Sequence, residues 1–161
     1  MGIAAALSEG RVVSIHIAPK GGAPTRSVDS VRAVVGKGLE GDRYFAFSGT
    51  FSKKGGPERE VTLIESEAVE AAARDLDLKV DAGAIRRNLV TRGVALNHLV
   101  GREFRVGAAR LKGIRLGEPC DHMEALSGVP GIRKALVHRG GLRAEILEGG
   151  LVRVGDIVVA D

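Results

Sequence analysis

The sequence predicts a mostly β protein, folded as an antiparallel barrel or sandwich. Short stretches that alternate apolar and polar residues recur along the chain, and residues typical of turns separate most of them. Glycine accounts for 23 of the 161 residues, which is about twice its usual share of roughly 7%. A chain of this length is typical of one hydrophobic core, so we expect a single domain over residues 1–161.

Eight segments show the two-residue period of half-buried strands. Because they are short and most are separated by turn residues, they favour antiparallel pairing. The expected strands are Val12–Ile17, Ser30–Val35, Glu60–Glu65, Asn88–Arg92, Glu103–Val106, Arg110–Leu116, Leu142–Leu147 and Leu151–Val159.

One clear helix is expected after Glu65, with Ser66 as its N-terminal cap. A weaker helix is expected to begin near Pro130 and to end before Gly140, since proline suits a first helical turn. The apolar stripe of the first helix, at the spacing i, i+3, i+4 and i+7, consists of Val69, Ala72, Ala73 and Leu76.

Two further segments have less regular patterns. A short helical turn is expected between Ala95 and Val100. The stretch Ser48–Pro57 is rich in Gly, Ser and Lys, and we expect it to be a mobile loop that acts as a lid.

The segment Gly36–Gly41 matches the pattern GxGxxG, which binds dinucleotides when a helix follows a strand. The residues after it show no helical period, so no helix N-terminus is expected to hold a pyrophosphate. We therefore interpret this segment as a turn that leaves Asp42 and Arg43 at its end.

The only cysteine is Cys120, which excludes an intrachain disulfide, a single-chain zinc knuckle and an iron–sulfur cluster. The longest apolar stretches are too short to cross a bilayer, and the first residues lack the pattern of a secretory signal. We therefore expect a cytoplasmic protein without a membrane partner.

The positive charge lies in the second half of the chain. Between residues 86 and 115 seven arginines and one lysine are accompanied by a single acid, Glu103, and arginine binds phosphate and carboxylate through its planar fork. These charges indicate an anionic partner, although solvated outward positions on strands are an equally simple interpretation. Binding of single-stranded nucleic acid is less favoured, because Phe104 is the only aromatic residue in this segment.

Cys120 lies among polar neighbours and follows Pro119, which is unusual for a buried structural cysteine. If residues 120–122 are extended, Cys120 and His122 lie on one face. A nearby imidazolium or arginine would then favour the thiolate that nucleophilic attack or soft-metal ligation requires. A cysteine–histidine protease arrangement is less favoured, since no partner base is identified.

Six short motifs in this order resemble the MOSC domain, which is named after the C-terminus of molybdenum cofactor sulfurase. The resemblance covers roughly residues 10–160 and implies a β-barrel like the barrel domain of pyruvate kinase. The motifs are Gly38–Arg43, Val61–Glu65, Arg86–Val90, Gly117–Cys120, Arg139–Ala144 and Val154–Asp156.

The resemblance implies roles for individual residues. Cys120 matches the cysteine that ligates molybdenum or carries sulfur, and Asp42 and His122 join it as the expected catalytic residues. Arg87 replaces a proline that some relatives have. The implied cofactor-binding residues, which would contact the pterin and its phosphate, are Arg86, Asn88, Arg43, Arg92, Gly140 and Gly141.

By this resemblance we expect a protein that binds the molybdenum cofactor (molybdopterin) and reduces N-hydroxylated substrates, with Cys120 as the molybdenum ligand. The cofactor would carry the redox chemistry, and a separate electron-donor protein would supply electrons. The substrate entrance would be walled by aromatic residues, unless these simply pack in the core. They are Tyr44, Phe45, Phe47 and Phe51.

Two other functions are compatible with the same sequence. In the first, a Cys120 persulfide carries sulfur to metal centres, supplied by a separate pyridoxal-phosphate-dependent cysteine desulfurase, because this chain has no room for a pyridoxal phosphate site of its own. In the second, the chain has lost its chemistry and only binds partners.

Overall fold

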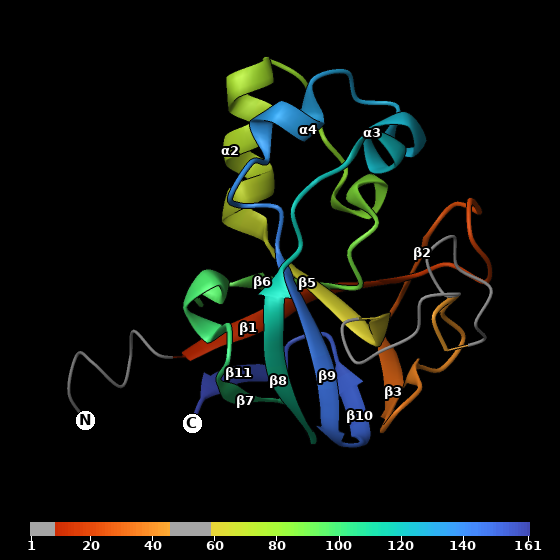
Figure 1. The fold of residues 1–161 in the computed structure, drawn as a ribbon, viewed down its shortest axis with the longest axis vertical. Coiled ribbons are helices and arrows are strands. Elements are labelled where there is room, and N and C mark those ends of the chain that lie inside the picture. The colour runs from red at the N-terminus through yellow and green to blue at the C-terminus, as the bar shows by residue number, and fades with distance from the viewer. Residues whose placement is uncertain (1–8, 46–58) are drawn as a thin grey trace.

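The computed structural model describes residues 9–45 and 59–161, and its centre is a closed barrel of seven strands (Figure 1). Neighbouring strands follow the order β11-β7-β8-β9-β5-β6-β1, and pairing between β1 and β11 closes the ring. Within the ring only β5 and β6 are parallel. The predicted mostly β barrel is therefore confirmed. The ring strands are β1 (Glu9–Ile17), β5 (Val61–Glu65), β6 (Leu89–Arg92), β7 (Glu103–Val106), β8 (Ala109–Leu116), β9 (Leu142–Glu148) and β11 (Ile157–Ala160).

Four short strands complete the described sheets. β2 (Arg26–Val28) pairs with β1, and a separate sheet has the order β10-β3-β4. Every predicted strand is present, but the last one divides in two, because a turn at Gly155 with φ +93° separates β10 from β11. β2 and β4 are not predicted by the sequence, because so few residues show no period. The second sheet consists of β3 (Ser30–Val34), β4 (Gly38–Leu39) and β10 (Gly150–Arg153).

The barrel is filled by the inward residues of its strands, which alternate with outward ones. Leu63, Leu89 and Leu142 pair across three adjacent strands and are all fully buried. Phe104 is also fully buried, so it is not exposed for stacking on a nucleic acid base.

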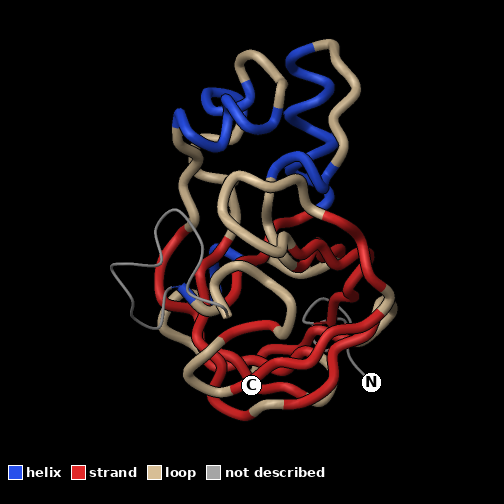
Figure 2. The backbone as a smooth tube through the Cα atoms, turned by 90° about the vertical axis from the view of Figure 1, so that its right-hand side faces the viewer, coloured by secondary structure: helices blue, strands red, loops and turns tan. Residues whose placement is uncertain are grey.

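Four of the five described helical segments gather at one end of the barrel, as Figures 1 and 2 show. These four pack a second apolar cluster against Ile64 and Val90, which point outward from β5 and β6, whereas the fifth, Leu96–Leu99, contributes Leu96 and Leu99 to the barrel core. The helical segments are α2 (Ser66–Leu76), α3 (Asp121–Ser127), α4 (Ile132–Ala135) and the 3-10 turns η3 (Ala82–Ile85) and η4 (Leu96–Leu99).

The first helix is present where the sequence predicts it, and Val69 and Ala72 of its stripe are buried. The predicted cap is wrong, because Glu65 occupies the N-cap position and makes no side-chain cap bond. The Ser66 hydroxyl instead accepts a hydrogen bond from Arg92 at 3.0 Å.

The segment after β8 differs from the prediction. Cys120 is extended, but a helix begins at Asp121, so residues 120–122 do not form one extended run. The helix expected from Pro130 onward is reduced to the four residues of α4, while η4 confirms the helical turn between Ala95 and Val100.

The glycines of Gly36–Gly41 form a turn, since Gly36, Gly38 and Gly41 all have positive φ. The residues from there to Phe45 are turns and bends, so no helix follows the glycine segment directly, as the sequence predicts. The expected lid, Ser48–Pro57, lies outside the described residues, as do Phe47 and Phe51. Among the described helices, none is both long and apolar enough to span a membrane.

Candidate functional site

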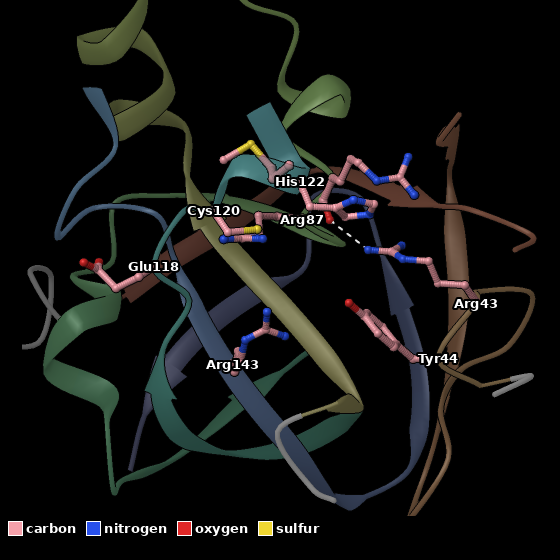
Figure 3. Close-up of a pocket in the computed structure, with 9 residues that line it drawn as sticks. Arg43, Tyr44, Arg87, Glu118, Cys120, His122 and Arg143 are labelled. Carbon is pink, nitrogen blue, oxygen red and sulfur yellow. Dashed lines mark hydrogen bonds between the residues drawn. The ribbon is translucent and has the colours of Figure 1, made fainter. Parts of the chain in front are cut away.

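A pocket of about 40 Å³ lies where β8 ends and β9 begins, beside the turn that carries Arg43 and Tyr44 (Figure 3). The ends of these two strands meet because Leu116 pairs with Leu142. The pocket combines four arginines with a thiol and an imidazole. It is lined by Arg43, Tyr44, Arg86, Arg87, Glu118, Cys120, His122, Met123 and Arg143.

Arg143 reaches the pocket because it points away from the barrel core. Its neighbours Leu142 and Ala144 face the core, and strand side chains alternate. Arg143 is only 9% exposed. Burial lowers the pKa of its guanidinium, whereas the interaction with Tyr44 raises it in part. It hydrogen bonds to Tyr44, yet its buried Nε and Nη1 have no partner among the described residues. Two unsatisfied buried donors cost free energy and indicate that this site receives an anion.

Arg87 forms the inner wall of the pocket. Its Nε donates to the carbonyl of Gly140 at 2.8 Å and its Nη2 to that of Gly117 at 2.5 Å. Burial, together with the positive charge of Arg143, lowers the pKa of Arg87 to about 10. Arg87 thus ties the two chain segments around the pocket together while keeping its positive charge at neutral pH.

Arg43 is held from two sides. Its Nη1 lies 3.1 Å from Asp42 Oδ1, and its Nη2 donates to the carbonyl of Arg86 at 3.2 Å, the contact dashed in Figure 3. Arg86 has a left-handed backbone, with φ +67°, and its Nη1 donates to the carbonyl of Ala23 at 2.5 Å. Burial and then the charge of Arg43 lower the pKa of Arg86.

Tyr44 interacts with two of the pocket arginines, Arg43 and Arg143. The Arg43 guanidinium is 4.5 Å from the centre of the Tyr44 ring. Burial alone would raise the pKa of Tyr44, but the charges of Arg43 and Arg143 and their hydrogen bonds outweigh it, so the pKa is lowered. The Tyr44 hydroxyl points into the pocket (Figure 3) and is made a better proton donor by its surroundings.

Cys120 is exposed and occupies the N-cap position of α3, with His122 and Met123 in the first turn. In Figure 3 its sulfur lies close to Arg87, with which it interacts. The carboxylate of Glu118 points away from the thiol and accepts a hydrogen bond from the His138 amide at 2.9 Å. In residues 9–45 and 59–161 no cluster of three His, Cys, Asp or Glu side chains can hold a metal ion. A metal at Cys120 would therefore need most of its ligands from a bound cofactor.

The comparisons with known proteins agree with this barrel. A model of the MOSC domain family matches residues 51–159, which is more than half of the chain. The chain belongs to the MOSC domain family. Comparison with curated proteins gives no match.

Solved structures share the fold of this MOSC domain. The crystal structure of the YUAD protein from Bacillus subtilis has a TM-score of 0.75 and 18% identity, with 93% of this chain and 94% of that chain covered. YiiM from Geobacillus stearothermophilus has a TM-score of 0.73 and 18% identity, with 94% and 75% covered. YiiM from Escherichia coli has a TM-score of 0.67 and 21% identity, with 94% and 69% covered.

The pocket of the MOSC domain brings together four of the predicted site residues. Arg43, Arg86, Cys120 and His122 all line it. Asp42 does not line it; its Oδ1 also accepts a hydrogen bond from the Ala18 amide at 3.0 Å, so it positions Arg43 from behind.

Asn88 is fully buried and does not line the pocket. Its Oδ1 accepts from the Thr62 amide at 3.0 Å and the Thr62 hydroxyl at 3.1 Å, and its Nδ2 donates to the His16 carbonyl. These bonds connect β1, β5 and β6, so the structure gives Asn88 a role in the barrel rather than in the pocket lining.

Gly140 and Gly141 contribute backbone only. The Gly140 carbonyl holds Arg87, and the Gly141 carbonyl accepts a hydrogen bond from the Gly117 amide at 2.8 Å. A Cβ at Gly141 would lie 2.0 Å from the Leu63 carbonyl oxygen, so only glycine fits there.

Most of the basic run lies away from the pocket. Arg92 pairs with Glu70 at 2.8 Å on the outside of α2. Arg110 pairs with Glu103 at 3.1 Å and with Asp161. The expectation that the run from 86 to 115 builds the anion site therefore needs correction: of these eight cations, only Arg86 and Arg87 line the pocket.

Arg87 and Arg143 line the pocket, although neither is among the individual site residues that the sequence predicts. The sequence marks Arg87 only as a member of the basic run and as a departure from the proline of some relatives. Arg143 stands at an outward position in an alternating strand, where a charged residue is ordinary, so no sequence signal distinguished it.

Proposed function

We propose that this MOSC domain binds the molybdenum cofactor, with Cys120 as the protein ligand to molybdenum, and reduces N-hydroxylated substrates. The observation that supports this most is the placement of the only thiol in one pocket with the unsatisfied guanidinium of Arg143. A soft thiolate suits a soft metal centre, and buried guanidinium donors suit a phosphate. We further propose that residues 1–161 form one domain that acts in the cytoplasm, where a lone thiol stays reduced.

The residues fit the anionic head of such a cofactor. Arg43, Arg86, Arg87 and Arg143 meet at the pocket, and Asp42 forms an ion pair with Arg43. The pocket is too small for a whole organic cofactor, since about 40 Å³ accommodates only a few water-sized groups. The remaining part of the cofactor therefore has to extend beyond this pocket.

When bound, the cofactor would accept two electrons and pass them to the substrate. The overall reaction converts R–NHOH, two electrons and two protons into R–NH₂ and water, with the N–O bond broken and the nitrogen reduced. A separate electron-donor protein provides the electrons. Tyr44 would donate a proton from its hydroxyl toward the departing oxygen, because the adjacent arginines stabilise its phenolate.

The remaining site residues hold this arrangement in place. Arg87 fixes the segment before Cys120 through the Gly117 carbonyl, and Asp42 fixes Arg43. His122 lines the pocket two residues after Cys120, in the first turn of α3, and is a second group that can carry a proton.

The test is to purify the protein from a molybdenum-replete host and to measure bound molybdenum and pterin. We expect wild type to contain both, Cys120→Ala to lose molybdenum, and Arg143→Met to lose both. Arg92→Ala is the matched control, because Arg92 is an exposed arginine outside the pocket, and it should retain both. If wild type holds neither molybdenum nor pterin after reconstitution with the isolated cofactor, the proposal is wrong.

A sulfur carrier is the second candidate, and the exposure of Cys120 favours it because a persulfide must reach a donor and an acceptor. Incubation with a cysteine desulfurase and cysteine would then add one sulfur to wild type but not to Cys120→Ala, measured by intact-protein mass. Efficient sulfur loading without molybdenum binding would favour this function over the reductase.

A further inference from the structure

The thiol pocket has the size of a small oxyanion. Its volume of about 40 Å³ accommodates only a few water-sized groups, since each of these needs roughly 10–15 Å³. A tetrahedral oxyanion is of this size, whereas a pterin or a nucleotide is far larger. The pocket by itself therefore favours a small, compact ligand.

Arg143 offers such an anion hydrogen-bond donors that are not used within the protein. Its guanidinium is directed into the pocket (Figure 3), and the residue is only 9% exposed. Its Nε and Nη1 are buried and have no partner in the described part of the chain. Guanidinium groups bind oxyanions through short, charge-assisted hydrogen bonds. An anion beside Arg143 would satisfy donors that are costly to leave unpaired.

Two other side chains make the same space suitable for an anion. The Tyr44 hydroxyl points into the pocket, where it can donate a hydrogen bond to an oxygen of the ligand (Figure 3). Glu118 also lines the pocket, but its carboxylate points away from the thiol and accepts a hydrogen bond from the His138 amide at 2.9 Å. Donors and positive charge therefore predominate around the thiol.

Cys120 is placed to react with an anion held in this way. Its thiol is exposed, and its sulfur lies close to the guanidinium of Arg87 (Figure 3). Arg87 is fixed by its bonds to the carbonyls of Gly140 and Gly117, so its charge stays beside the sulfur. A thiolate attacks a sulfur–sulfur bond most readily when the leaving group is weakly basic. Sulfite leaves more readily than an alkyl thiolate, so thiosulfate combines the oxyanion that the pocket favours with a sulfur that can be transferred.

We propose that the cofactor-free protein is a sulfurtransferase that takes sulfur from thiosulfate, which Arg143 binds with its outer sulfur toward Cys120. The Cys120 thiolate attacks the outer sulfur, a sulfur–sulfur bond to Cys120 forms, and the sulfur–sulfur bond of thiosulfate breaks. The electron pair of that bond leaves with sulfite. Cys120–S⁻ and ⁻S–SO₃⁻ thus give Cys120–S–S⁻ and SO₃²⁻, and cyanide then removes the outer sulfur as thiocyanate and restores the thiolate.

This activity goes beyond the proposed reductase and uses neither molybdenum nor pterin. It also differs from loading by a cysteine desulfurase, because a free anion delivers the sulfur instead of a partner protein. Thiosulfate and a cofactor phosphate would compete for Arg143, so the activity belongs to the protein without its cofactor. Failure of sulfur transfer therefore leaves the reductase in place, and failure of molybdenum binding leaves the sulfurtransferase in place.

The experiment incubates cofactor-free protein with thiosulfate and measures the intact mass and, after cyanide is added, the thiocyanate formed. We expect wild type to gain one sulfur and to produce thiocyanate over many turnovers, and Cys120→Ala to do neither. Arg143→Met should lower kcat/KM for thiosulfate about tenfold or more, because it removes the donors that hold the anion. Its alkylation by neutral iodoacetamide should change less than about twofold, which separates loss of anion binding from a disturbed thiol.

The matched control is Arg105→Met. Arg105 also points outward from a barrel strand, but it pairs with Glu148 at 3.9 Å and does not line the pocket. This variant should keep kcat/KM for thiosulfate within about twofold. Sulfate provides a measurement that needs no variant: it should inhibit the wild-type reaction competitively, since it is a similar oxyanion without a transferable sulfur.

Each outcome decides the inference. Absence of both the sulfur adduct and thiocyanate in wild type overturns it, as does a reaction that is equally fast in Arg143→Met or insensitive to sulfate. Loading by a cysteine desulfurase but not by thiosulfate also overturns it and leaves the sulfur carrier in place. Turnover by a protein that binds no molybdenum after reconstitution supports the inference and removes only the proposed reductase.

Discussion

The carboxylate of Asp42 and the guanidinium of Arg43 form a buried ion pair at 3.1 Å, with side chains 0% and 7% exposed. Replacing Asp42 with Asn leaves a buried cation without its counter-charge. We expect Asp42→Asn to lower the free energy of unfolding by about 3 kcal/mol or more, measured by chemical denaturation. Glu70→Gln, which breaks the exposed pair with Arg92, should cost less than about 1 kcal/mol. Equal effects of the two substitutions would contradict this account.

Arg143 should lower the stability of the folded protein although it contributes to anion binding. Its Nε and Nη1 are buried and unsatisfied, so Arg143→Met is expected to raise the free energy of unfolding by about 1–3 kcal/mol in buffer without polyvalent anions. Phosphate or molybdate should raise the melting temperature of wild type but not of Arg143→Met. Arg92→Met serves as the control and should respond to anions as wild type does. A destabilised Arg143→Met that still responds to anions would show that Arg143 is purely structural.

The arginines around Cys120 should make its thiol selective for anionic reagents. Because it is the only cysteine, alkylation can be followed on the whole protein by mass. We expect the rate ratio of iodoacetate to iodoacetamide to be about threefold or more higher in wild type than in Arg143→Met, and to decrease with salt. A ratio that changes neither with salt nor with the substitution would refute electrostatic attraction at this pocket.

His16 should contribute a pH dependence to stability. Burial lowers its pKa in the folded protein below the unfolded value of about 6.5, so the unfolded state binds the proton more readily. Stability should therefore fall as pH decreases from 7.5 through 6.5 and below. The raised pKa values of Glu60 and Glu65, caused mainly by burial, act in the opposite direction.

The difference between wild type and His16→Gln isolates this contribution, because both proteins retain Glu60 and Glu65. Denaturation at pH values from 5 to 7.5 should show a smaller loss at acid pH in His16→Gln. Identical slopes would mean that His16 titrates alike in the folded and unfolded states.

Gly141 should tolerate no side chain. Its φ is +111° and an added Cβ would lie 2.0 Å from the Leu63 carbonyl oxygen, at the place where β9 meets β5. We expect Gly141→Ala to lose more than about 4 kcal/mol or to fail to fold, as seen by far-ultraviolet circular dichroism. Gly22→Ala has a similar positive φ but nothing within 4 Å, so it should cost only about 1 kcal/mol. A mild effect of Gly141→Ala would argue against a close approach of the two strands.

Prediction from sequence succeeded where a feature is local. The alternation of residues such as Leu63 and Leu89 reports directly which side of a strand is buried. It failed at short elements: β4 has two residues, and α3 begins directly after Cys120, where no period has room to appear.

The candidate site was predicted in part for the same reason. Cys120 and His122 are close in the chain, and Arg43 and Arg86 belong to recognisable motifs. Arg86 and Arg92 belong to the same basic run, so the sequence does not distinguish them. In the structure β6 separates them, and Arg92 pairs with Glu70 rather than lining the pocket.

The sequence by itself determined the fold class, the presence of a single thiol and the family resemblance, because alternation, composition and motif order are properties of the chain. Only the tertiary structure decided which charges surround that thiol. Arg43, Arg87 and Arg143 come from three separate segments, and closure of the barrel brings them to one pocket. The burial that leaves two donors of Arg143 unsatisfied also depends on this closure, because desolvation is set by the surrounding packing and not by neighbours in sequence.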